Sequence, residues 1–132
     1  MAVTATPIFP QAIATVVVAV TSSVATGFTA GANGSKITAI GASNSGAISD
    51  LQIFYNGTAA ANQIGIVSVP AGAGVTAGSA VPTYDVLRSA QVPFFSYDSF
   101  GNRQMFVAPT NTLAFKTSIA SGVNLYIEAA SF

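Results

Sequence analysis

The sequence predicts an all-β protein built as an antiparallel β-sandwich, with at most one short helix near residues 83–90. Short runs rich in Val, Ile, Thr and aromatic residues recur along the chain, and most of them alternate apolar with polar positions. Turns containing Gly and Asn separate these runs, and helical periodicity is nearly absent. Because a half-apolar strand packs only one face, two sheets packed face to face are favoured over a barrel.

The expected strands follow in order along the chain. Residues 12–20 are an almost continuous β-branched run, which is typical of a strand buried on both faces. Seven further strands are expected over residues 24–30, 36–42, 48–55, 63–69, 103–108, 112–119 and 123–129. In the last of these, alternation points four residues inward, namely Val123, Leu125, Ile127 and Ala129.

One segment interrupts the β pattern. Residues 83–90 read as either an irregular connection or a helix of about two turns, in which Thr83 would cap the first turn and Asp85 would lie within it. Both interpretations stay open at this point.

The chain divides into an extended N-terminal arm, residues 1–11, and a single β-sandwich domain, residues 12–132. Pro7 and Pro10 favour an extended arm that does not join a central strand. Its apolar residues Ile8 and Phe9 either dock on a neighbouring subunit or belong to a frayed tail.

Composition excludes many kinds of site. The 132 residues include no Cys, His or Trp, which rules out zinc fingers, thiol or imidazole catalysis and disulfides. Charged residues are 6% of the chain and balance to zero net charge, so the electrostatic contribution to nucleic-acid binding is missing. Hydrophobic residues make up 51%, and we expect much of this excess to lie at contacts between subunits rather than on a monomer.

No membrane span or export signal is expected. The most apolar stretch, residues 12–20, is shorter than the roughly 20 residues of a spanning helix. The first basic residue is Lys36, whereas a secretory signal begins with positive charge. We therefore expect synthesis in a cytoplasm.

The sequence indicates no catalytic residue, metal ligand or cofactor, and we expect the protein not to be an enzyme. The carboxylates are dispersed, at Asp50, Asp85, Asp98 and Glu128. Asp98 and Asn102 match an ordinary turn better than a calcium loop. Ser35 and Lys36 are adjacent on an expected strand, so they point to opposite faces and cannot cooperate.

An aromatic cluster lies between two cations, Arg88 and Arg103. Its members are Phe94, Phe95, Tyr97 and Phe100. Two cations make a poor groove for a nucleic-acid backbone, and aromatic residues near Arg are typical of interface centres. The cluster is therefore either part of the core or a contact with another subunit.

Four segments resemble the small virion proteins of tailed bacteriophages that are encoded beside the major capsid protein. They are residues 28–37 with Ile40, 51–57, 84–87 and 125–129. The resemblance implies a jelly-roll-like β-sandwich that decorates and cements a capsid, with the major capsid protein as its partner. Because a threefold capsid position makes a trimer with standard interfaces natural, we expect self-association as a homotrimer. We also expect a place on the capsid surface of the virion, after synthesis in the host bacterial cytoplasm. No catalytic residue, membrane contact or nucleic-acid contact is implied.

We expect apolar loops to make the capsid contacts, with Ile8, Phe9, Phe94, Phe95, Tyr97 and Phe100 as the candidate interface residues. Two alternatives stay open. The protein is a tail or fibre component of the same virion, or it is a carbohydrate-binding module. In the second case Tyr55, Tyr84, Tyr97 or Tyr126 would line a shallow groove.

Overall fold

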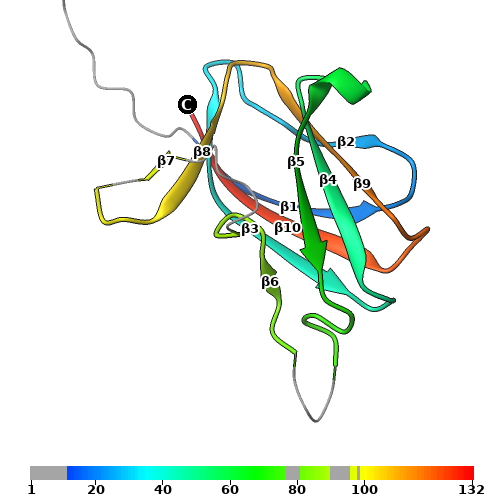
Figure 1. Cartoon of the computed structure of the whole chain (residues 1–132). Helices are drawn as coiled ribbons and strands as arrows, with labels where there is room; N and C mark the ends of the chain where they lie inside the picture. The colour runs from blue at the N-terminus through cyan, green and yellow to red at the C-terminus, as the bar shows by residue number, and fades with distance from the viewer. Residues whose placement is uncertain (1–11, 77–80, 90–95, 98) are drawn as a thin grey trace, which may run out of the picture.

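The computed structural model describes residues 12–76, 81–89, 96–97 and 99–132, which form two antiparallel sheets (Figure 1). The first sheet contains, in spatial order, β1 (Ala12–Val20), β10 (Val123–Ser131), β3 (Ser35–Asn44), β8 (Arg103–Val107) and β7 (Ser96–Tyr97), and β6 (Tyr84–Asp85) also pairs with β3. The second contains β2 (Ala25–Thr29), β9 (Thr112–Thr117), β4 (Ser49–Tyr55) and β5 (Gln63–Val69). The prediction of an all-β antiparallel sandwich is confirmed.

The strand order is that of a long antiparallel ribbon wound into two layers. The ribbon pairs β1 with β10, β2 with β9, β3 with β8 and β4 with β5. Successive ribbon pairs alternate between the two sheets until the chain turns back at β4 and β5. This order corresponds to the jelly-roll-like arrangement expected from the sequence.

The apolar core lies between the two sheets. Strand alternation places one face of each long central strand in this core, which contains Ile37, Leu51, Leu113, Phe115 and Leu125 among its fully buried side chains. The four residues of β10 expected to point inward are all buried, while Asn124 and Tyr126 between them are exposed. Alternation therefore identified the core face of this strand correctly.

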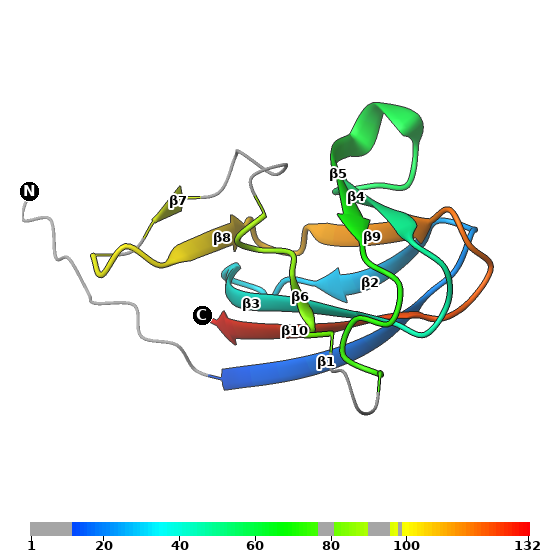
Figure 2. The same cartoon turned by 60° about the horizontal axis from the view of Figure 1, so that its bottom comes forward.

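The prediction that residues 12–20 are buried on both faces is wrong. β1 has the expected bounds, but it is the outermost strand of its sheet (Figure 2). Ile13 is 77% exposed and Val17 72%, and only Val20 is fully buried. A β-branched run indicates a strand, but it does not indicate whether another strand lies beyond it.

Residues 83–89 contain no helix. Tyr84 and Asp85 pair with Ala42 and Gly41 of β3, and the Val86 N–H donates to the Ile40 carbonyl at 2.9 Å. The backbone groups that a helix would use internally are therefore bonded to β3, and Thr83 caps nothing. Within the described residues, the one helical element is a 3₁₀ turn, η1 (Ala60–Asn62), before β5.

Two Asn-Gly pairs, Asn33-Gly34 and Asn56-Gly57, supply positive φ in turns. Gly34 has φ +92°, and a Cβ there would lie 3.2 Å from the Val107 carbonyl oxygen. Asn56 has φ +51° at the end of β4.

The described part of the chain holds no helix that is long and apolar enough to cross a membrane. The expected arm, residues 1–11, lies outside the described residues.

Candidate interaction surface

The hairpin of β7 and β8, at one edge of the first sheet, projects away from the second sheet in both views (Figures 1 and 2). Its paired residues are Ser96 with Gln104 and Tyr97 with Arg103. The Ser96 hydroxyl adds a hydrogen bond to the Gln104 carbonyl at 3.3 Å. Tyr97 is 60% exposed, and Phe100, in the turn between the strands, is 89% exposed. Two large aromatic side chains are therefore exposed on this projecting hairpin.

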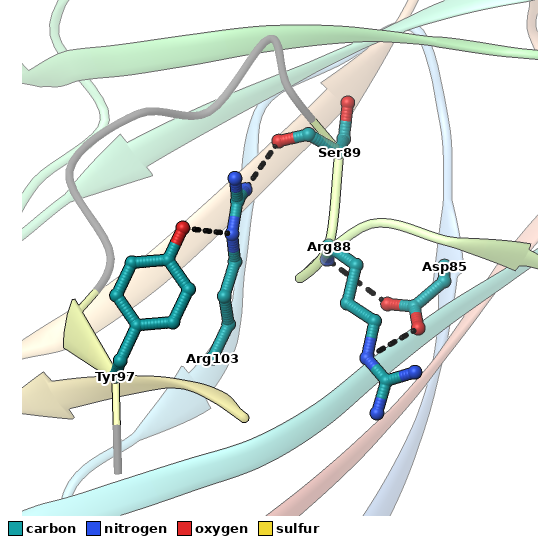
Figure 3. A network of polar contacts seen from close by, with 5 residues as sticks. All are labelled: Asp85, Arg88, Ser89, Tyr97 and Arg103. Atoms are coloured by element: carbon teal, nitrogen blue, oxygen red, sulfur yellow. Dashed lines mark hydrogen bonds and ion pairs between the residues drawn. The ribbon is translucent and has the colours of Figure 1, made fainter. Parts of the chain in front are cut away.

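Arg103, in the strand pair next to the hairpin turn, connects this hairpin to the rest of the domain (Figure 3). Its Nη1 donates to the Ser89 carbonyl at 2.7 Å, and its Nε donates to the Tyr97 hydroxyl at 3.3 Å. The guanidinium carbon also lies 5.7 Å from the centre of the Tyr97 ring, within the range of a cation–π contact. One side chain thus joins the two hairpin strands to each other and to the turn that follows β6.

The turn that Arg103 holds is itself anchored in the core. Val86 and Leu87 are buried in the apolar cluster between the sheets. The Tyr84 hydroxyl bonds the Ser89 hydroxyl at 3.2 Å. The neighbouring pair of Asp85 and Arg88 is exposed, with a 3.5 Å ion pair and a 3.1 Å bond from the Arg88 N–H. The hairpin therefore rests on a core-packed turn rather than on the exposed ion pair.

A second group of exposed apolar side chains lies on the outer face of the first sheet. Val17 of β1 is opposite Tyr126 of β10, which is opposite Gly41 of β3. Gly41 has no side chain, and two shallow hollows lie beside it on this face. Tyr126 and Thr83 line both hollows. The face is apolar, shallow and open, which suits a flat contact better than a buried small molecule.

The structure brings together only part of the expected interface. Tyr97 and Phe100 are exposed on one hairpin, as a contact with another subunit requires. Phe94, Phe95, Ile8 and Phe9 lie outside the described residues, so their roles stay predictions. The sequence placed Tyr126 on an outward face, but it did not indicate that Val17 lies beside it, since these residues are on different strands.

The tyrosines do not form a single groove in the described chain. The Tyr55 hydroxyl accepts from the Ala108 N–H and from Asn111 Nδ2, both at 3.1 Å. The Tyr97 hydroxyl accepts a hydrogen bond from Arg103, and Tyr84 and Tyr126 line a common hollow of about 240 Å³.

Charged and nucleophilic side chains are likewise dispersed. Among the described residues, no three Asp or Glu gather where they could hold a metal ion. Ser35 is buried on the core face and bonds the Ser131 hydroxyl at 2.9 Å, while Lys36 follows it on the outer face. The two were expected on opposite faces, and the alternation of β3 places them so. Asp98 lies outside the described residues.

Comparison with known proteins adds no relative: no family model, no curated protein and no solved structure matches this chain.

Proposed function

We propose that the protein is a structural virion protein that decorates and cements the capsid of a tailed phage. It binds the major capsid protein through apolar contacts and sits at the capsid surface, with three copies around a threefold position. The proposal rests on the resemblance of its sequence segments to such proteins and on the surface described above. The observation that carries it is the anchored aromatic hairpin of β7 and β8.

The hairpin supports the proposal because its anchoring lowers the cost of binding. Arg103 already orders Tyr97 and ties both strands to the core-packed turn at Ser89. A contact made through Phe100 therefore needs little further ordering of the strand pair next to the turn. Exposed aromatic residues on a fixed framework are typical interface anchors, and they suit a chain in which only 6% of residues carry charge.

Binding to empty capsid shells tests the proposal. Shells of the major capsid protein are mixed with wild type or with Phe100→Ala, and the bound fraction is measured after sedimentation. We expect the variant to bind about tenfold more weakly, because it loses the aromatic anchor. Ile66→Ala is the matched control, since it removes an exposed apolar side chain from β5 in the other sheet, and it should bind like wild type.

The outcomes separate the parts of the proposal. If the wild type does not bind shells, the capsid assignment is wrong. If both variants bind like wild type, the capsid assignment stands but the hairpin is not the contact.

The carbohydrate-binding alternative has one observation in its favour, the hollow that Tyr84 and Tyr126 share. An aromatic side chain beside Thr83 and Asp85 offers a ring face with polar neighbours, which a sugar ring requires. A glycan array probed with wild type and Tyr126→Ala decides this. A glycan bound by the wild type and lost by the variant would favour the module over the cement protein.

A further inference from the structure

β1 forms a long, regular and uncharged edge of the first sheet. Its ladder with β10 runs without interruption from the pair of Ala12 and Ser131 to the pair of Val20 and Val123. On its other side no strand pairs with it within the described residues. The nine residues, AIATVVVAV, include no charge, glycine or proline. An edge of this kind is a template for pairing with another strand.

The other sheet edges carry the features that discourage such pairing. The ladder of β2 with β9 shifts register between Thr26 and Phe28, and that of β5 with β4 shifts between Ile53 and Phe54. β7 is only two residues long. Natural proteins protect edges by bulges and by short strands, and these three edges follow that rule. Among the sheet edges that the structure describes, only β1 has neither feature, so its length and regularity favour pairing with another strand.

We propose that β1 pairs antiparallel with β1 of a second copy of this chain, about a twofold axis at Val16. This register uses all nine residues of both strands. It places Ile13 opposite Ala19 of the second copy, and Thr15 opposite Val17. Because paired residues differ by an even number of positions, the outer face of one sheet continues into the outer face of the other. Ile13 against Ala19 and Val18 against Ala14 also match large side chains with small ones.

Charge supports a second copy as the occupant. The charged side chain next to β1 is Glu128 of β10, opposite Thr15. In the proposed pairing, Thr15 lies between Glu128 of its own copy and Val17 of the second copy. Glu128 therefore has no charged residue of the second copy's β1 near it. Lys36 lies two strands away from Ile13, beyond Ala130. An uncharged strand is best matched by another uncharged strand, and β1 itself meets this requirement.

The size of the contact sets the strength to expect. Nine residues span about 30 Å, and a sheet is about 10 Å thick, so the pairing buries about 300 Å² of each copy. A stable complex buries about 800 Å² per partner. The contact therefore forms a reversible dimer at high protein concentration. It uses the β1 edge and not the hairpin, so it is independent of the proposed capsid function.

Disulfide trapping tests the register directly. The chain has no cysteine, so single introduced cysteines report single positions. An oxidised mixture of Ile13→Cys and Ala19→Cys should give a disulfide-linked dimer, because opposite residues lie about 5 Å apart. Either variant alone should give none, because its two copies would be about 20 Å apart along the strands, beyond the reach of a disulfide. No dimer in the mixture, or as much dimer from either variant alone, would overturn the proposal.

Sedimentation equilibrium tests the same contact without crosslinking. In the proposed register, Val17 of one copy is the diagonal neighbour of Val17 of the other copy. Val17→Lys therefore brings two positive charges close together, and we expect the dissociation constant of the dimer to rise by about tenfold or more. Ile66→Lys, on the edge strand of the other sheet, should leave it within about twofold of wild type. A wild type that is monomeric at millimolar concentration, or equal weakening by both variants, contradicts the proposal.

Discussion

The guanidinium of Arg103 lies over the ring of Tyr97, 5.7 Å from its centre, and donates a hydrogen bond to the hydroxyl of the same residue. The two residues are directly opposite each other in the β7–β8 ladder. Arg103 also reaches the Ser89 carbonyl, so this pair connects the projecting hairpin to the turn that packs in the core. Arg103 therefore helps to fix the position of Tyr97 and of the turn that carries Phe100.

Arg103→Ala should therefore lower the free energy of unfolding by about 1–2 kcal/mol, because it leaves the part-buried Ser89 carbonyl without its charged donor. Urea denaturation measures this. Arg88→Ala is the control, because it removes an exposed ion pair and should cost about 0.5 kcal/mol or less. Equal effects of the two variants would show that Arg103 does not anchor the hairpin.

Two neighbours on β10 test the assignment of its faces. Leu125 is fully buried between the sheets, so Leu125→Ala should cost about 2–5 kcal/mol through lost burial and a residual cavity. Tyr126 is next to it on the outer face, and Tyr126→Ala should cost about 1 kcal/mol or less. Both values come from the same denaturation experiment. A reversed order would place the core on the other face of the sheet.

Asn44 provides a test of the polar interior. It is fully buried at the end of β3, where its Nδ2 donates to the Ala47 carbonyl at 2.8 Å and its Oδ1 accepts from the Gly46 N–H at 2.9 Å. Asn44→Asp keeps the shape but turns a carboxylate oxygen toward that carbonyl, and we expect a loss of about 3 kcal/mol.

Asn124→Asp is the matched control for this change. Asn124 is exposed on β10, so the same substitution there should shift the melting temperature very little. If Asn44→Asp melts like wild type, the amide contacts do not contribute to stability.

Sequence reasoning found the long strands because a β-branched run and alternation are each properties of one strand by itself. β1 and β5 have the expected bounds, residues 12–20 and 63–69. It missed β6 and β7, since two residues carry no periodicity, and their pairing depends on β3 and β8. Residues 83–90 left a helix and an irregular connection open, and the described residues 83–89 form no helix because their backbone bonds to β3. That partner is on another strand and gives no local sequence signal.

The candidate surface was predictable only in part. Aromatic residues near Arg103 pointed to Tyr97 and Phe100, both of which are exposed. The contact between Arg103 and the Ser89 carbonyl had no sequence signal, because it joins segments brought together only by folding. The exposure of Ile13 and Val17 was missed because it depends on where β1 lies in the sheet.

The number of copies of this protein in purified phage particles tests the central claim most directly. Particles are separated on a density gradient, and the copies are counted by quantitative mass spectrometry against the major capsid protein. A cement protein should be present in a simple integer ratio to the major capsid protein. A few copies per particle would place it in the tail or fibre, and its absence from purified particles would contradict the virion function.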